Sequence, residues 1–224
     1  MPPRTDREYA AKLALLRKRL LLMAGRVETM IGASMHALVE RDATVARETI
    51  SMDATVNRAE REIDELCLLI LAKWHPVASD LRFITLVLKM VTDLERIGDL
   101  AVNICERAVD LAQLPQLRPY EDIPKMAAIV ESMLHDAMEA FLARDVDKAR
   151  AIMKRDDTLD RLYTQVFRDV LEVMAENPVA VTRGIHVQSV AKWLERMGDH
   201  ATNLAEQIIF LIDGKDIRHE GKLG

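Results

Sequence analysis

The chain has few of the residues that build turns and sheets. Its 224 residues include only eight glycines and seven prolines, about half the average share, and aromatic residues make up 4%. Turns favour glycine and proline, and strands favour aromatic and β-branched residues. Leucine, alanine, methionine, glutamate and arginine are abundant instead, and these residues favour helices. The composition excludes a β-sandwich, a collagen-like chain and a disordered chain, and it predicts long helices with few turns.

Long apolar runs and cysteines are also scarce. The longest unbroken apolar run covers residues 66–72, far short of the roughly 20 residues that span a bilayer. Cys67 and Cys105 are the only cysteines, which provides no disulfide framework, and Cys67 reads as a small buried apolar residue. The basic residues 17–19 interrupt the first apolar stretch, which argues against a signal peptide. These features predict a cytoplasmic protein without a membrane span.

The charge distribution restricts the partners. The net charge of −5 argues against nucleic acid as a partner, because binding to a phosphate backbone requires a basic surface. The first 26 residues are a local exception, with seven basic residues against two acidic ones. This run is either a solvated helix face or a contact for an acidic partner or an anionic membrane surface. Its basic members are Arg4, Arg7, Lys12, Arg17, Lys18, Arg19 and Arg26.

Short breaks divide the chain into six helical stretches, which end near residues 40, 73, 112, 143, 176 and 213. Pro76 and Pro178 interrupt two of the long stretches, because proline lacks a backbone donor. Ser79 and Asp80 are candidate N-caps for the third helix. The segment 115–124 holds three prolines and is the best candidate for a linker.

The two halves of the chain are related in sequence. Residues 94–106 read LERIGDLAVNICE and residues 194–206 read LERMGDHATNLAE, with the same residue at eight of thirteen positions. Such a repeat indicates one supersecondary unit used twice. The sequence therefore predicts an elongated all-α fold of two tandem three-helix bundles. The first bundle covers residues 1–114, the linker residues 115–124 and the second bundle residues 125–224.

Acidic and amide side chains form rows on the helices of both copies. At 100° per residue, Glu95, Asp99 and Asn103 share one helix face, and the apolar residues lie opposite. If the second and third helices of a copy lie side by side, two such rows face each other. The row members are Asp53, Asn57, Glu60, Asp64, Glu95 and Asp99 in the first copy, and Asp156, Asp160, Glu195 and Asp199 in the second.

A bound cation would explain these rows. Like charges four residues apart on a helix are mildly destabilising, and oxygen ligands suit Mg²⁺, Mn²⁺, Ca²⁺ or iron. The alternative is a solvated acidic face. We expect Arg96 and Arg196 to pair with the acids, His200 to be a candidate for supporting a metal ligand, and the repeated glycines to mark close helix contacts. These glycines are Gly98 and Gly198.

These motifs resemble those of a known family. The tandem LERIGD…N and LERMGD…N, the D-x-x-x-N at residues 53–57, the D-x-x-x-D at residues 156–160 and the PVASDLR turn at residues 76–82 together resemble the PhoU family. The resemblance covers nearly the whole chain and includes the duplicated three-helix architecture.

The resemblance implies a function. PhoU proteins are cytoplasmic negative regulators of the phosphate-starvation response in bacteria. They act as adaptors between a high-affinity phosphate ABC transporter, through its ATPase, and a sensor histidine kinase, and they modulate phosphate uptake. Members often form homodimers.

The resemblance also implies metal sites. Some members bind iron or zinc clusters on acidic pairs of adjacent helices, so the cofactor here would be a divalent or ferric ion such as iron, zinc or magnesium. An amide carries no charge, so the first-copy site with Asn57 is expected to bind metal more weakly. The matching ligands are Asp53, Asn57, Glu95, Asp99, Asp156, Asp160, Glu195 and Asp199.

Two alternatives to a non-enzymatic regulator remain open. Helix bundles with inward carboxylates host di-iron enzymes and iron stores, but those sites use a Glu-x-x-His spacing, which this sequence does not contain. A metal-free helical scaffold would need no ligands at all. The sequence shows no catalytic nucleophile with its base and no glycine-rich phosphate loop, so we assign no catalytic residue.

Overall fold

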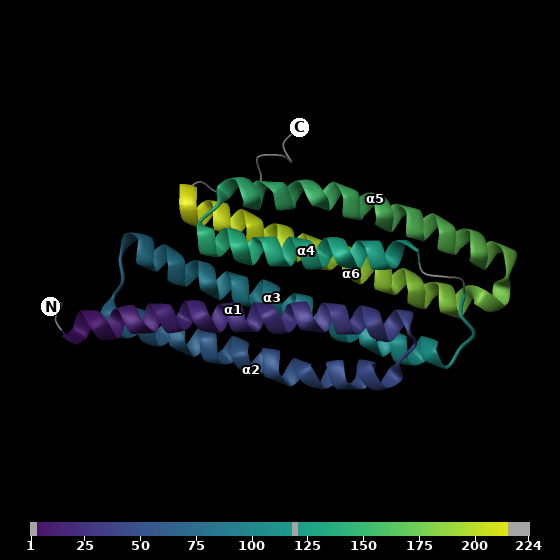
Figure 1. Ribbon diagram of the computed structural model, residues 1–224, viewed down its shortest axis with the longest axis horizontal. Coiled ribbons are helices and arrows are strands. Elements are labelled where there is room, and N and C mark those ends of the chain that lie inside the picture. Colours follow the sequence, from purple (N-terminus) through teal and green to yellow (C-terminus); the bar gives the residue numbers. More distant parts are fainter. Residues whose placement is uncertain (1–3, 118–120, 215–224) are drawn as a thin grey trace.

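The computed structural model describes residues 4–117 and 121–214; the outer ends of both predicted bundles and part of the predicted linker lie outside this range. The described residues form six α-helices and one short 3₁₀ turn, with no strand (Figure 1). All six predicted helices are confirmed. Their bounds are α1 Arg4–Val39, α2 Ala43–Trp74, α3 Ala78–Ala112, α4 Asp122–Ala143, α5 Val146–Glu176 and α6 Val181–Asp213, with the 3₁₀ turn η1 at Pro178–Ala180.

The first turn of each repeat is built by the same Arg-Asp pair. Arg41 and Arg144 both adopt the left-handed conformation, with φ of 59° and 55°, which ends the preceding helix. Asp42 then caps α2 by accepting hydrogen bonds from the backbone amides of residues 44 and 45. Asp145 caps α5 in the same way, accepting from the backbone amide of Lys148 at 2.9 Å. The repeated dipeptide therefore determines both where one helix ends and where the next begins.

The predicted N-cap of α3 is wrong. The helix begins at Ala78, before Ser79 and Asp80, and its N-cap Val77 makes no side-chain hydrogen bond. The carboxylate of Asp80 instead accepts a hydrogen bond from the Tyr9 hydroxyl of α1, at 2.8 Å. The Asp80 side chain therefore makes a tertiary contact with α1 instead of capping its own helix.

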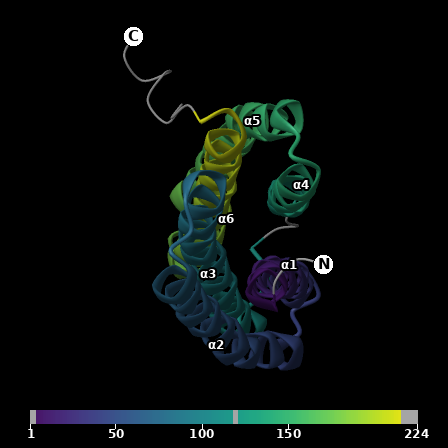
Figure 2. The same ribbon diagram turned by 90° about the vertical axis from the view of Figure 1, so that its left-hand side faces the viewer.

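The two three-helix units lie side by side rather than end to end. The long helices run antiparallel to their sequence neighbours, and α3 of the first unit packs against α6 of the second (Figure 1). Viewed end-on, α2, α3, α6 and α5 form a curved row, and α1 and α4 lie on its concave side (Figure 2). The repeats are therefore joined along their third helices as well as by the linker, and α4 begins within the segment 115–124 that the sequence assigned to that linker.

One hydrophobic core runs through both units. Its buried residues come from all six helices and include Leu20, Ile63, Leu94, Leu134 and Leu204. Each unit alone would leave one face of its third helix uncovered, so the α3–α6 contact completes the burial of both. Among the described helices, none has a stretch long and apolar enough to cross a bilayer.

Candidate functional site

The acidic rows of the first repeat face each other across α2 and α3. Glu95 is largely covered, with 16% of its side chain exposed, whereas Asp99 is 37% exposed. On α2, the amide of Asn57 donates a hydrogen bond to Asp53 Oδ2 at 2.7 Å. The other carboxylate oxygen of Asp53 and the amide oxygen of Asn57 are buried without a hydrogen-bond partner. Two buried oxygen ligands are therefore left unsatisfied beside the α3 row.

Two carboxylates of this cluster, Asp53 and Glu95, hold their protons more tightly than usual. Burial first, and then the charge of Asp99, raises the pKa of Asp53. Burial and Asp99 also raise the pKa of Glu95, against the opposing charge of Arg96. These shifts show that α2 and α3 bring like charges into a partly desolvated space.

The second repeat carries one more carboxylate at the four matched positions. Burial, followed by the charges of Asp160, Asp199 and Glu195, raises the pKa of Asp156 from 3.8 to about 6. One oxygen of Asp156 is buried without a hydrogen-bond partner. The pKa values of Asp160 and Asp199 are also raised, in both cases mainly by burial and then by Glu195. Across the four matched positions, Asp160 in place of the amide Asn57 gives the second repeat four carboxylates against three. The first repeat also has Glu60 on α2, whose charge further raises the pKa of Glu95.

The cations that flank the two clusters differ. Arg96 lies 3.5 Å from Glu95 and donates a hydrogen bond to Asp99 at 3.2 Å, as expected. Arg196 does not pair with the acids, and that expectation is wrong. Its place is taken by Lys192, one turn earlier on α6, whose ammonium lies 2.7 Å from Glu195. The repeat does not mark Lys192, because the corresponding residue of the first copy is Thr92.

The repeated glycines mark close helix contacts, as predicted, but the two contacts differ in tightness. A Cβ added at Gly98 would lie 3.5 Å from Val56 on α2, which is ordinary van der Waals contact. A Cβ added at Gly198 would lie 2.2 Å from Leu159 on α5 and 3.4 Å from an oxygen of Asp156. Gly198 therefore allows α5 to approach α6 closely at the level of the second acidic cluster.

The donor chemistry of both clusters suits a hard cation. A bound cation would satisfy the buried oxygens that lack partners. It would also offset the repulsion between adjacent carboxylates that raises their pKa values. Within residues 4–117 and 121–214, however, no three His, Cys, Asp or Glu side chains are already gathered around one point. Binding would therefore require rotation of these carboxylates toward a common ion.

His200 lies outside the acidic clusters, in a polar contact between the repeats. Its Nδ1 is 2.9 Å from the carboxylate of Asp93, a buried residue of α3. Gln207 and Asn203 of α6 donate hydrogen bonds to the same carboxylate, at 2.7 and 3.3 Å. Sequence analysis missed Asp93, although one signal was present: it is a charged residue on the apolar face of its helix, 200° from Glu95 at 100° per residue.

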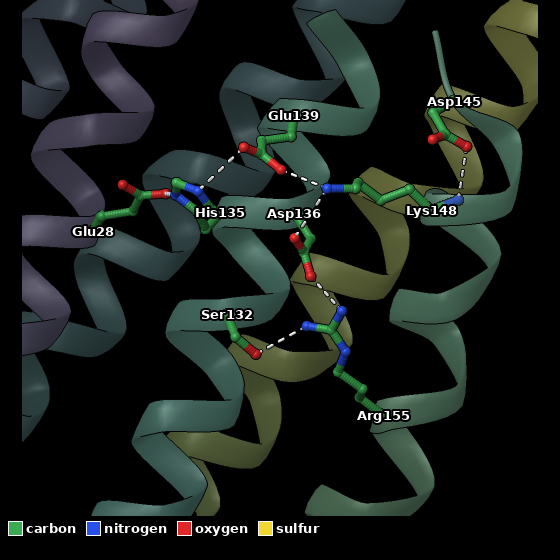
Figure 3. Close-up of polar contacts among 8 residues, drawn as sticks. All are labelled: Glu28, Ser132, His135, Asp136, Glu139, Asp145, Lys148 and Arg155. Carbon is green, nitrogen blue, oxygen red and sulfur yellow. Dashed lines mark hydrogen bonds and ion pairs between the residues drawn. The ribbon is translucent and has the colours of Figure 1, made fainter. Parts of the chain in front are cut away.

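A further polar network fastens α4 to its neighbours (Figure 3). Asp136 lies between Lys148 and Arg155 of α5, in ion pairs with both. Burial raises the pKa of Asp136, but the hydrogen bonds and charges of these two cations outweigh it and lower the pKa. On the other side of α4, His135 lies 3.5 Å from Glu28 of α1. In the first repeat, Ala33, Val45 and Met52 stand at the positions of Asp136, Lys148 and Arg155. The ion pairs between α4 and α5 are therefore specific to the second repeat.

The protein is a tandem repeat of two helical units related in sequence. Each unit has a cluster of acidic side chains between two adjacent helices, which gives two candidate cation sites. The family model of the PhoU domain matches this chain twice, over residues 20–108 and residues 123–208. The chain belongs to the PhoU family.

Known relatives match over most of their own length. A Pseudomonas aeruginosa protein named phosphate-specific transport system accessory protein PhoU homolog is 38% identical over 217 residues, covering 96% of this chain and 90% of that protein. The Escherichia coli phosphate-specific transport system accessory protein PhoU is 32% identical over 214 residues, covering 96% and 89%.

Solved structures agree with the fold. The crystal structure of PhoU from Pseudomonas aeruginosa matches with a TM-score of 0.90 and 38% identity, covering 92% of this chain and all of that one. The crystal structure of the phosphate transport system regulatory protein PhoU from Streptococcus pneumoniae matches with a TM-score of 0.86 and 26% identity, covering 93% and 99%.

Proposed function

We propose that this protein is a cytoplasmic, non-enzymatic regulator of phosphate uptake. It acts as an adaptor between a phosphate ABC transporter and a sensor histidine kinase, and it represses the phosphate-starvation response when phosphate is plentiful. The observation that carries the proposal is the match of both repeats to the PhoU domain, together with relatives named as accessory proteins of the phosphate-specific transport system. A homodimer and peripheral contact with the membrane through the transporter are part of this proposal.

A gene deletion tests the regulatory role. Cells that lack the gene should express phosphate-starvation genes in high phosphate, and the wild-type gene supplied in trans should restore repression. Normal repression in the deletion strain would contradict the proposal. The adaptor role predicts that the tagged protein co-purifies with the transporter ATPase and with the kinase, and the absence of both would contradict that part.

The acidic clusters are proposed to bind metal ions. In the second repeat the ligands would be Asp156, Asp160, Glu195 and Asp199. In the first repeat they would be Asp53, Asn57, Glu95 and Asp99. The buried oxygens of Asp53 and Asp156 without hydrogen-bond partners support this assignment, because a bound cation would satisfy them. The second cluster is expected to bind more tightly, since Asp160 carries a charge that the amide Asn57 lacks. A bound ion would supply charge neutralisation between the helices.

Metal analysis separates this proposal from a metal-free scaffold. Protein purified without chelator should contain metal, and the double variant Glu195→Ala/Asp199→Ala should lose it from the second site. A matched control is Glu172→Ala/Glu176→Ala, an exposed pair with the same spacing on α5. Unchanged metal content in the first variant, or equal loss in the control, would contradict the site.

The carboxylates leave one enzymatic alternative, a di-iron oxidase or iron store. Such sites use Glu-x-x-His motifs that project into the bundle. Here both acidic clusters consist of carboxylates and one amide, and His200 bonds to Asp93 instead. The regulator proposal predicts no ferroxidase activity and no hydrolysis of common phosphoesters by the purified protein. Robust turnover of either kind would overturn the non-enzymatic assignment.

A further inference from the structure

A cavity of about 370 Å³ opens at the end of the molecule where α1 begins and α6 ends. Its lining comes from α1, α3, α4 and α6, so both repeats contribute to it. Three of the lining residues are arginines, Arg17 of α1, Arg82 of α3 and Arg144 at the end of α4, and the only lining carboxylate is Asp80. A volume near the lower limit of ligand pockets fits a small molecule rather than a folded partner.

The described part of the chain does not neutralise the three guanidinium groups. No ion pair or hydrogen bond joins them to another side chain among the described residues, and Asp80 is already engaged by the Tyr9 hydroxyl. The ends of α4 and α6 contribute about half a negative charge each, and the beginning of α3 about half a positive one. The cavity therefore keeps an excess of roughly one and a half positive charges. An anion is the ligand class that this excess favours.

A neighbouring aromatic ring holds one of the arginines at the wall. The guanidinium of Arg17 lies over the ring of Phe83, 5.4 Å from its centroid, and Phe83 stacks on Phe141 of α4 at 6.1 Å. A Cβ added at Gly214 would lie 3.0 Å from an Arg82 nitrogen. The glycine that ends α6 thus leaves the space that Arg82 fills. The contact of Arg17 with Phe83 preorganises that arginine and reduces the entropy lost when a ligand binds.

The internal repeat supplies a natural comparison, because the second copy lacks this site. The sequence Pro-Val-Ala leads into the third helix of each repeat, at residues 76–78 and 178–180. Counted from it, Asp80 and Arg82 correspond to Thr182 and Gly184. A Cβ at Gly184 would collide with Met174, at 2.6 Å, so packing occupies the equivalent space. The wall from α1 is missing as well, since α1 has 36 residues and α4 only 22.

Two equivalent arginines of the repeats make different contacts. Arg41 donates hydrogen bonds to the carbonyl oxygens of Leu111 and Ala112, at 2.9 and 3.3 Å, and to that of Leu114, and so caps the end of α3. Arg144 stands at the same position of the second repeat but makes no such contact with the described end of α6. Its guanidinium lines the cavity instead.

We propose that this cavity binds a small phosphate-bearing anion, held by Arg17, Arg82 and Arg144. Guanidinium groups match the geometry of phosphate oxygens with paired N–H donors, and such charge-assisted hydrogen bonds are the strong ones. The cavity is larger than a single oxyanion requires, so a phosphate ester also fits. The site is separate from the acidic clusters, and the inference does not depend on the proposed regulatory role.

Equilibrium titrations with inorganic phosphate and with glycerol 3-phosphate test the proposal. The wild-type protein should bind at least one of these probes saturably. Arg82→Gln and Arg144→Gln should each weaken binding roughly tenfold or more, because each removes charge-assisted hydrogen bonds. Ala14→Phe, which narrows the cavity without changing charge, should also weaken binding. The matched control is Arg58→Gln, which removes another exposed positive charge, from α2, and should change affinity less than twofold.

Three outcomes would overturn the inference. The first is the absence of saturable binding of both probes at millimolar concentration. The second is an equal loss of affinity in Arg58→Gln, which would indicate a diffuse charge effect. The third is binding to phosphatidylglycerol vesicles that depends on Arg82 and Arg144 while neither free probe binds, which would assign the arginines to a membrane surface. Circular dichroism melting of each variant verifies that it remains folded, and Ala14→Phe gives an independent result if one arginine variant is unstable.

Discussion

The carboxylate of Asp93 in α3 lies 2.9 Å from Nδ1 of His200 in α6, and this pair connects the two repeats inside their interface. Gln207 donates to the other oxygen of the same carboxylate at 2.7 Å. In the second copy, Trp193 stands where the first has Asp93. The two third helices therefore meet through an asymmetric contact, with the acid on one side and its donors on the other.

Removal of Asp93 should destabilise the whole molecule. Asp93→Ala leaves His200 and Gln207 without their acceptor, at a cost of about 3 kcal/mol. For a chain of this size the melting temperature should fall by roughly 6–12 °C. Asn203 is exposed and makes the longest of the three hydrogen bonds to Asp93, at 3.3 Å. Asn203→Ala should therefore lower the free energy of unfolding by less than about 1 kcal/mol. Equal losses in the two variants, measured by urea unfolding, would show that Asp93 is not the centre of the junction.

Alanine at the two repeated glycines should have opposite effects. Gly98→Ala adds a methyl group at ordinary contact distance from Val56 and should stabilise α3 by up to about 1 kcal/mol through helix propensity. Gly198→Ala places its Cβ 2.2 Å from the buried side chain of Leu159, which must move, at a cost of about 1–3 kcal/mol. Urea unfolding of both variants measures the difference. Changes of the same sign would contradict the difference in packing between the repeats.

Mild acid should stabilise the metal-free protein. Burial and four neighbouring carboxylates raise the pKa of Asp156 from 3.8 to about 6, so the folded state binds this proton more readily than the unfolded state. Stability should therefore rise as the pH falls from 7 toward 4, by on the order of 1–2 kcal/mol after solvent screening. Urea unfolding in the presence of a chelator, at pH 7 and pH 5, measures this gain.

A pair of variants assigns that pH dependence to the cluster. Asp156→Asn should be more stable than wild type at pH 7 and should lose most of the gain on acidification. Glu172→Gln, an exposed position of α5, should retain the gain. The reverse pattern would place the titrating group outside the second acidic cluster. Below about pH 4 the trend should reverse, because the lowered pKa of Asp136 makes its ion pairs a source of stability that is lost on protonation.

Both cysteines should be inert in the folded protein. Cys67 and Cys105 are fully buried, and burial is the main cause that raises the pKa of each thiol to about 12. The thiolate is the reactive form, so iodoacetamide at pH 8 should label neither residue until urea unfolds the chain. A thiol introduced by Ala128→Cys, at an exposed position of α4, should react readily and provides the positive control. Labelling of native Cys67 or Cys105, detected by mass spectrometry, would contradict the burial of that side chain.

Much of the candidate site follows from local sequence. Glu95 and Asp99 are four residues apart, so helix periodicity alone puts them on one face, and the repeat places Glu195 and Asp199 identically. The cation that pairs with the second acidic row was harder to predict from the sequence. Lys192 pairs with Glu195 because the two side chains stand three residues apart on α6, and no repeat signal marks it.

The sequence by itself determined the six helices, their breaks, the tandem repeat and the acidic rows. Each of these depends on contacts within a few residues along the chain, such as helix periodicity, the Arg-Asp turn and proline. Only the tertiary structure decided that α3 packs on α6, that Asp93 meets His200, and that Arg41 caps a helix while Arg144 faces a cavity. Equivalent residues receive different partners because long-range packing depends on the shape and charge of surfaces far apart in sequence.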